Sequence, residues 1–229
     1  MNPQGKAAFL HLADGSSPLK ARSFGADVSV SGEVVFNTGM VGYPEALSDP
    51  SYRGQILVLT YPLVGNYGVP DESIVDEYGL PKYFESSEIH IAALVVSSYS
   101  WEHSHWAARK SLSKWLIENN TPGIYGIDTR ELTKNIREHG ALLGHVELGP
   151  KDGVPMSFST DIIDDPNKRN LVAEVSTKEI KVYGEGNNPC IIAYDCGMKY
   201  NIIRYFVNTH KVKLVVVPFD YDLEANSSN

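Results

Sequence analysis

The chain has 229 residues, 28 of them acidic and 20 of them Lys or Arg, so its formal net charge is −8 at pH 7. Its hydrophobic and charged fractions, 42% and 21%, are those of an ordinary globular protein with one large domain or two small ones. The acidic balance argues against a protein that binds nucleic-acid phosphates through clustered cations, and no apolar run reaches the about 18 residues that span a membrane. The first residues, MNPQGKAAFLHLADGS, resemble neither a secretory signal nor an Arg-rich presequence, which predicts a cytoplasmic protein.

The first 148 residues are predicted to form an α/β domain that begins with several short strands. Apolar runs separated by turn residues predict these strands, and Asp14-Gly15 is the expected turn of a hairpin between the first two. The predicted strands cover residues 7–12, 17–24, 32–38, 55–61, 89–99, 123–127 and 141–148. The Gly- and Pro-rich stretch between the third and fourth strands leaves room for a short helix near residues 45–48.

Two longer helices are predicted in the second half of this domain. Trp106, Trp115 and their apolar neighbours recur at helical spacing, which predicts a helix over residues 103–120. The second helix is expected over residues 128–140. It has Asp128 as its N-cap, Glu131 at the position of a capping box, and a glycine after its last turn.

The amino-acid composition of the chain changes after residue 148. Residues 149–188 are polar and rich in turn residues, which is typical of a connector between domains. Residues 189–229 then place a strand, a helix over residues 198–208 and a second buried strand in succession, which predicts a βαβ unit and a parallel sheet. One such unit cannot cover both faces of its sheet, so residues 189–229 are predicted to be the incomplete start of an α/β domain.

The scattered histidines offer no convincing metal site. His103 and His105 form a His-x-His pair, but two helical residues two positions apart point in different directions. His139 and His145 stand elsewhere, and no cysteine or carboxylate lies at ligand spacing. The Gly-x-Gly of YGEGNN precedes a strand and lacks the third glycine of a dinucleotide-binding loop. We therefore predict no bound metal and no cofactor in this chain.

Two cysteines invite a redox or nucleophilic interpretation. Cys190 and Cys196 would lie about 20 Å apart along one strand, too far for a disulfide. Cys196 stands at a strand-to-helix turn, where a nucleophile could sit, but Asp195 replaces the small residue that a nucleophile elbow needs. A structural cysteine is the preferred interpretation, with Asp195 and Lys199 shaping the turn and an interface.

The Pro-Ser-Tyr turn at residues 50–52 suggests a binding site without catalysis. Ser51 follows a proline, so its hydroxyl and backbone groups are held in one direction in a segment with very little formal charge. A neutral donor and acceptor of this kind suits an amide or a small zwitterion such as an amino acid. From composition alone this remains one interpretation among others.

Several long stretches resemble the glutamine-hydrolysing small subunit of carbamoyl-phosphate synthetase. They are GEVVFNTGMVGYPEALSDPSYRGQILVLTYPLVGNYG, IDTRELTKNIREHGALLG, DPNKRNLVAEVSTKEIKVY and IIAYDCGMKYNIIRYFV. They occur in the family's order, cover the chain from about Ala7 to Pro218, and are most similar to eukaryotic fused forms. In those forms this region opens either the cytosolic pyrimidine-pathway multienzyme or the synthetase of the urea-cycle type.

The resemblance implies a fold, an activity and partners. It implies a small-subunit N-terminal domain over residues 1–148, a connector over 149–188, and over 189–229 the first βαβ unit of a flavodoxin-like class I amidotransferase domain. The family releases ammonia from L-glutamine with a Cys nucleophile and a His base. A synthetase portion, which holds ATP and Mg and docks on the N-terminal domain, then makes carbamoyl phosphate for pyrimidine or arginine synthesis.

Only one functional residue of the family carries over to this sequence. The family's serine in Pro-Ser-Tyr contacts the bound glutamine and matches Ser51. The Gly-x-Cys-x-Gly elbow and the His-Pro-Glu motif are absent, so the resemblance places both beyond Asn229 and the chain alone is expected to be inactive. The alternative is a non-catalytic docking or regulatory module of the synthetase complex. The sequence leaves the pathway, the effectors and the oligomeric state open.

Overall fold

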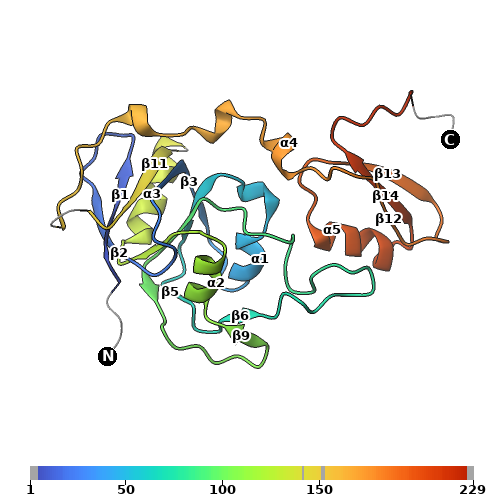
Figure 1. The fold of residues 1–229 in the computed structure, drawn as a ribbon, viewed down its shortest axis with the longest axis horizontal. Coiled ribbons are helices and arrows are strands. Elements are labelled where there is room, and N and C mark those ends of the chain that lie inside the picture. Colours follow the sequence, from blue (N-terminus) through green and yellow to red (C-terminus); the bar gives the residue numbers. More distant parts are fainter. Residues whose placement is uncertain (1–4, 141, 151–152, 226–229) are drawn as a thin grey trace.

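The computed structural model describes residues 5–140, 142–150 and 153–225. Figure 1 shows an elongated molecule with a strand-rich unit at one end and a smaller sheet with one helix at the other. A mainly irregular segment runs along one side and links the two, carrying the short helix α4 (Leu171–Val175). Within the described ranges, no helix is long and apolar enough to cross a membrane.

The larger unit is a closed, seven-stranded barrel. Its strands are β1 (Ala7–Leu12), β2 (Leu19–Ser23), β3 (Val30–Asn37), β4 (Gln55–Leu59), β7 (Ala93–Val96), β10 (Gly123–Tyr125) and β11 (Leu142–Leu148). The order around the barrel is β1-β11-β3-β4-β7-β10-β2. Strands β3, β4, β7 and β10 run parallel to one another, whereas β2, β1 and β11 join them by antiparallel pairing. The predicted hairpin is confirmed, since β1 and β2 pair antiparallel.

Side-chain alternation gives the closed sheet an apolar interior. One set of apolar residues points into the barrel, including Leu10, Val34, Ile56 and Val95, all of which are fully buried. Helix α3 (Thr129–His139) adds Leu132 and Ile136 to the same cluster at one end of the barrel. Closure removes the exposed edges that an open sheet of this length would present to other chains.

The other face of β4 and β7 forms a second apolar core outside the barrel. Leu57 and Leu94 pack there against helices α1 (Tyr43–Leu47) and α2 (Leu112–Glu118) and against several aromatic rings. Two small sheets lie at its border, β5 (Leu63–Val64) with β8 (Ser98–Tyr99) and β6 (Val69–Pro70) with β9 (Ala108–Lys110). Strands that are buried on both faces have continuous apolar sequences, as β4 and β7 do.

The helix predicted over residues 103–120 is wrong in its first half. Helix α2 begins only at Leu112, after the N-cap Ser111, whose hydroxyl accepts a hydrogen bond from the amide of Lys114. Residues 108–110 form β9 instead, and Trp106 is 82% exposed rather than packed inward. The spacing of Trp106 therefore extended the predicted helix past its true start at Leu112.

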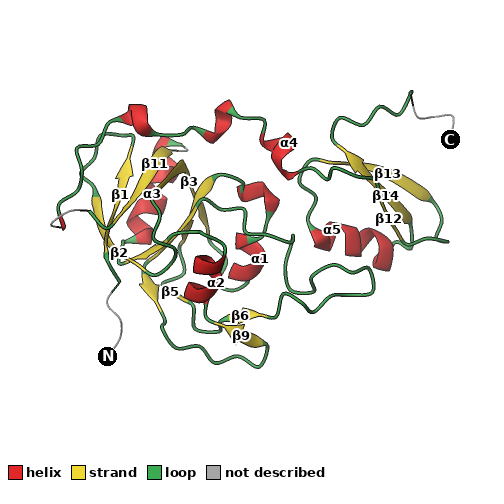
Figure 2. Ribbon diagram, in the orientation of Figure 1, coloured by secondary structure: helices red, strands yellow, loops and turns green. Residues whose placement is uncertain are grey.

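The smaller unit contains the predicted βαβ arrangement. Strands β13 (Cys190–Asp195) and β14 (Lys213–Pro218) are parallel, and α5 (Tyr200–Arg204) with the following π-helical turn η5 (Tyr205–Thr209) connects them. A third strand, β12 (Lys181–Tyr183), pairs antiparallel with β14, so the sheet order is β12-β14-β13. Figure 2 shows the helix on one face of this sheet only. Strand β12 lies inside the stretch predicted to be connector.

The linking segment follows the barrel, and its described part carries the short helical turns η3 (Thr160–Ile162), η4 (Pro166–Lys168) and α4. Near its start, the amide of Met156 donates to the carboxylate of Glu147 on β11, at 3.2 Å. Near its end, Glu174 accepts a hydrogen bond from Nε of Arg53, at 3.0 Å. These contacts hold the segment against the barrel unit.

Candidate functional site

The Pro-Ser-Tyr turn folds into a short 3₁₀ helix, η1 (Pro50–Tyr52), immediately before β4. Asp49 caps it, since its Oδ1 accepts a hydrogen bond from the amide of Ser51 at 2.9 Å. Proline at the first position and an Asx-type cap both favour this turn. Ser51 is exposed, and its hydroxyl has no hydrogen-bond partner among the described residues. The turn therefore holds the backbone of Ser51 in place and leaves its hydroxyl unused.

A second turn lies opposite, where β13 leads into α5. Asp195 is buried, and its Oδ1 accepts hydrogen bonds from the amides of Gly197 and Met198, at 2.9 and 2.8 Å. Its Oδ2 accepts a third from the amide of Thr177, at 2.7 Å. The carboxylate thus shapes the turn, as predicted. Cys196 is exposed at the tip, and Cys190 at the start of β13 is exposed as well; neither forms a disulfide in the described structure.

The two turns meet across the boundary between the units. Lys199 Nζ lies 3.3 Å from Oδ2 of Asp49, so one carboxylate both caps the Ser51 turn and pairs with the second unit. Gly197 adopts a positive φ of 98°, and a Cβ at this position would lie 3.2 Å from Cβ of Pro50 and 3.0 Å from Cγ2 of Val175. The predicted interface role of Lys199 is confirmed, and the positive φ together with these tight contacts favours glycine at position 197.

A loop of the barrel unit, residues 71–85, reaches over α5; we call it the arm. Nε of Arg204 lies 2.7 Å from Oδ2 of Asp76, and its Nη2 donates to the carbonyl of Pro81 at 2.6 Å. The amide of Tyr200 donates to the carbonyl of Glu85 at 2.9 Å. Leu80 is buried in the apolar core of the smaller unit. The arm therefore supplies part of that unit's core and caps its helix.

The electrostatics of the arm favour an ionised Asp76. Burial alone would raise the pKa of Asp76, but hydrogen bonds from Arg204 and from the amides of Leu80 and Tyr78 outweigh it, so the pKa is lowered. The carboxylate stays charged near neutral pH and holds the Arg204 guanidinium in place.

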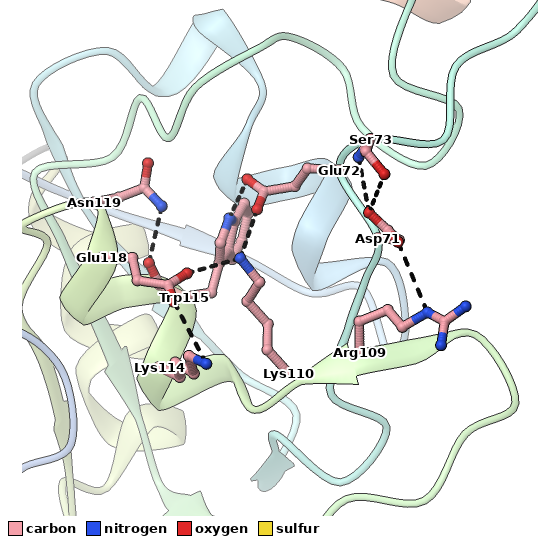
Figure 3. A network of polar contacts seen from close by, with 9 residues as sticks. All are labelled: Asp71, Glu72, Ser73, Arg109, Lys110, Lys114, Trp115, Glu118 and Asn119. Atoms are coloured by element: carbon pink, nitrogen blue, oxygen red, sulfur yellow. Dashed lines mark hydrogen bonds and ion pairs between the residues drawn. The ribbon is translucent and has the colours of Figure 1, made fainter.

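A polar network fixes the base of the arm to α2, as Figure 3 shows. Lys110 Nζ bridges Glu72 Oε2 and Glu118 Oε2, at 2.8 and 2.7 Å. The indole Nε1 of the buried Trp115 donates to the other oxygen of Glu72 at 2.7 Å. The pKa of Lys110, which burial alone would lower, is raised by these hydrogen bonds. The arm thus starts from a rigid anchor before it crosses to the smaller unit.

The four histidines considered as metal ligands do not converge on one site. His103 and His105 lie in the loop before β9, His139 is at the end of α3, and His145 is on β11. Among the described residues, no group of three or more His, Cys, Asp or Glu is placed to hold a metal ion. The His-x-His pair is therefore not assembled into a ligand set.

One buried polar cluster was not predicted. Nε2 of His11 on β1 lies 2.8 Å from Glu147 Oε2, and Phe158 from the linking segment stacks on the His11 ring at 4.7 Å between centroids. His145 lies opposite His11 where β11 pairs with β1. The pKa of His145 is lowered, mainly by burial and to a lesser extent by the charge of His11. The only sequence signal was a single histidine within an otherwise apolar strand. The cluster fastens the linking segment to the barrel.

The geometry supports binding more than covalent chemistry. The Ser51 hydroxyl stands beside a boundary between two units and has no base within the contacts described above. Cys196 has no histidine or lysine partner among the hydrogen bonds and ion pairs of the described chain. The chain is thus a mixed α/β protein, a seven-stranded barrel joined to a βαβ unit, with a polar site at their junction.

Comparison with known proteins assigns a family to this architecture. Residues 10–146 match the family model described as carbamoyl-phosphate synthase small chain, CPSase domain. The match covers nearly all of the barrel together with its helices, which is more than half of the chain. The chain therefore belongs to the carbamoyl-phosphate synthase small-chain family, as the sequence resemblance predicted.

Three curated relatives illustrate the range of proteins that contain a similar region. Multifunctional protein ura1 of Schizosaccharomyces pombe is 52% identical over 95% of this chain and 11% of its own length. The mitochondrial carbamoyl-phosphate synthase [ammonia] of Homo sapiens is 48% identical over 97% of this chain and 14% of its own length. Multifunctional protein CAD of Squalus acanthias is 55% identical over 96% of this chain and 9% of its own length. The chain thus spans about a tenth of each relative.

Proposed function

We propose that this chain is part of the glutamine amidotransferase component of a carbamoyl-phosphate synthetase. In this role it helps to supply ammonia from L-glutamine to a synthetase portion, which uses bicarbonate and ATP with Mg to make carbamoyl phosphate. Membership of the small-chain family and the resemblance to relatives named as carbamoyl-phosphate synthase or multifunctional proteins support the proposal. The N-terminal barrel unit is the part proposed to dock on the synthetase portion.

Ser51 is proposed to contact the glutamine substrate. The observation that carries this assignment is its exposed hydroxyl, which the described chain leaves unused, on a turn whose backbone amide is held by the Asp49 cap at the junction with the second unit. A neutral hydroxyl can donate to or accept from an amide or an α-amino acid group without introducing a charge. The turn then forms one wall of a site whose catalytic groups come from elsewhere.

The division of the chain follows from the same proposal. Residues 1–148 form the small-subunit N-terminal domain, 149–188 the connector, and 189–229 the first part of a class I amidotransferase domain of flavodoxin-like type. The parallel pair β13 and β14 with its crossover helix is compatible with that fold, although β12 adds an antiparallel edge. No Gly-x-Cys-x-Gly or His-Pro-Glu occurs in the 229 residues, so we propose that the chain alone does not hydrolyse glutamine.

A non-catalytic docking or regulatory module is the second candidate function. The observation that favours it is the sheet of the smaller unit, where Ile192 and Tyr194 on β13 are 48% and 42% exposed, which suits a face that another surface covers. Either function is compatible with the pyrimidine or the arginine and urea pathway. We propose a cytoplasmic location, while one of the relatives is named as mitochondrial.

The test compares two nitrogen donors in the full-length protein that contains this chain. Ser51→Ala is expected to lower kcat/KM for glutamine about tenfold, as the loss of one substrate hydrogen bond predicts, and to leave ammonia-dependent synthesis unchanged. Ser16→Ala is the matched control, because the Ser16 amide donates to Asp14 Oδ1 at the same 2.9 Å. Equal losses with both donors, or no loss, would contradict the Ser51 assignment.

Two further outcomes separate the candidate functions. A full-length protein that makes no carbamoyl phosphate from glutamine or ammonia would favour the docking module. Glutaminase activity in the purified 229-residue chain that is lost in Cys196→Ala would refute its proposed inactivity.

A further inference from the structure

A basic hollow lies outside the site described above, between α3 and the end of the barrel. Its volume is about 320 Å³. Threonines and cations alone line it, namely Thr38, Thr60, Arg130, Thr133, Lys134 and Arg137. Thr38 and Thr60 directly follow β3 and β4, which are parallel and end in register at Asn37 and Leu59. The carboxyl ends of parallel strands are where α/β sheets commonly bind ligands.

The three cations form one stripe along α3. Arg130, Lys134 and Arg137 are spaced i, i+4 and i+7, so they share a face of the helix and are all exposed. Among the described residues, Arg130 and Arg137 form no ion pair, and Lys134 approaches only the exposed Glu131, at 3.7 Å. Three concentrated cations with so little compensation stand out in a chain of net charge −8.

The position of Arg130 opposes the electrostatics of its own helix. It follows Thr129, the first residue of α3, where the helix macrodipole is positive and a cation is destabilising by a few tenths of a kcal/mol. Arg130 is not needed to cap the helix, because Asp128 already accepts a hydrogen bond from the amide of Glu131 at 2.9 Å. Helix stability therefore gives no reason for an arginine here, whereas an anion in the hollow would.

The hydroxyl of Thr133 donates to the carbonyl of Thr129 at 2.7 Å, so the groups available to an anion are the cations and the two threonines at the strand ends. The guanidinium of Arg137 lies over the Phe36 ring, 5.1 Å from its centroid, which restricts its rotamers and leaves its N–H groups available. The hydroxyl of the exposed Thr38 has no hydrogen-bond partner in the described chain. The hydroxyl of Thr60 makes only a long bond, 3.3 Å, to the carbonyl of Asn37.

We propose that this hollow binds the phosphate group of a small phosphorylated molecule. Two arginines and a lysine match a dianion better than a single carboxylate, since guanidinium groups bind phosphate oxygens in pairs. A volume of about 320 Å³ admits a phosphate ester of the size of a sugar phosphate. A nucleic-acid backbone is disfavoured, because the chain as a whole is acidic, with a net charge of −8.

The test measures phosphate binding directly in the purified full-length protein by isothermal titration calorimetry. The probes are inorganic phosphate, pyrophosphate and ribose 5-phosphate, with sodium chloride at matched ionic strength. The Arg130→Gln/Arg137→Gln variant is expected to lose affinity for the preferred probe at least tenfold. The matched control is Lys20→Gln/Lys211→Gln, which removes two exposed cations outside the hollow and is expected to change affinity less than twofold.

Because synthetase portions bind ATP, the readout must separate this hollow from such sites. Heteronuclear NMR of the full-length protein with methyl-labelled threonine is the second measurement, and Thr38 and Thr60 are expected to shift with the probe. Tighter binding of the ester than of free phosphate identifies a metabolite as the ligand, and the reverse identifies inorganic phosphate. The proposal is overturned if no probe binds up to tens of millimolar, if both double variants weaken binding equally, or if neither threonine shifts. None of these outcomes bears on the Ser51 assignment.

Discussion

At the scale of single residues, the junction between the two units depends on the absence of a side chain. Gly197 has a φ of 98°, and a Cβ there would lie only 3.2 Å from Cβ of Pro50 and 3.0 Å from Cγ2 of Val175. The nearby Asp49 carboxylate pairs with Lys199 while it caps the Ser51 turn. A change at Gly197 therefore affects the position of Ser51 without touching it.

We expect Gly197→Ala to lower the free energy of unfolding by about 2–3 kcal/mol, because left-handed strain and the contact with Pro50 add. Gly186→Ala is the matched control, since Gly186 has a φ of 87° but no atom within 4 Å of a Cβ. In this control only the left-handed strain is introduced, so its free energy of unfolding is expected to fall by about 1–2 kcal/mol. Urea denaturation of both variants checks the difference, and equal losses would show that the contact with Pro50 is unimportant.

Single residues also show which contacts the sequence could predict and which it could not. Asp195 was predicted to shape its turn, and it accepts two amide hydrogen bonds within the turn and a third from Thr177 of the linking segment. The His11–Glu147 pair was not predicted, because the two residues are 136 positions apart and come together only when β1 and β11 pair. Ser51 remains a prediction, since its partner would be a ligand.

At the scale of helices and strands, local sequence signals located some element ends correctly, whereas the pairing of strands distant in the sequence was not predicted. Helix α3 begins after Asp128 and ends before Gly140, as its caps predicted. The strand order could not be read from the sequence, because β11 inserts between β1 and β3 and closes the barrel by contacts across more than a hundred residues. Trp106 misled the helix prediction because a single exposed aromatic residue resembles one turn of an amphipathic pattern.

The anchor of the arm allows a prediction at this scale. Lys110→Met removes the cation between Glu72 and Glu118 and leaves two carboxylates facing each other beside Trp115 (Figure 3). We expect the free energy of unfolding to fall by about 1–2 kcal/mol, the value for losing hydrogen bonds to charged groups in a partly buried site. Methionine keeps most of the apolar stem, so packing changes little.

Lys114→Met provides the comparison for that variant. Lys114 lies one turn away, its side chain is 66% exposed, and it approaches Glu118 only at 3.8 Å. Its replacement is expected to change stability by less than about 0.5 kcal/mol. Thermal unfolding followed by tryptophan fluorescence measures both variants, and a Lys110 effect no larger than that of Lys114 would show that the network does not stabilise the arm.

At the scale of the whole molecule, the two units are joined by polar contacts as much as by apolar ones. The arm contributes Leu80 to the core of the smaller unit, but most of its links to α5 are hydrogen bonds and one ion pair. Interfaces of this composition resemble those between domains that can separate. The stability of the smaller unit should therefore depend on groups that belong to the barrel unit.

Asp76 is the residue through which this dependence can be measured. Asp76→Asn keeps an acceptor for the amides of Tyr78 and Leu80 but removes the charge that holds Arg204. Hydrogen exchange should become faster in α5 and β14 and stay unchanged in the barrel strands, because local opening of the smaller unit becomes easier. Asp71→Asn is the control, since Asp71 forms the same kind of turn with Ser73 but meets only the exposed Arg109, at 3.7 Å.

The pH dependence of this exchange has a definite sign. The folded pKa of Asp76 lies below its ordinary value of 3.8, so its contribution to stability is complete above that pH and is lost as the pH falls through the lowered pKa. Exchange in α5 of the unaltered chain, corrected for the intrinsic rate, should therefore accelerate below about pH 4, where the carboxylate of the unfolded chain also becomes protonated. In Asp76→Asn the acceleration should be smaller, because one titrating group has been removed. Identical acid profiles for the two proteins would mean that the ion pair with Arg204 does not couple the units.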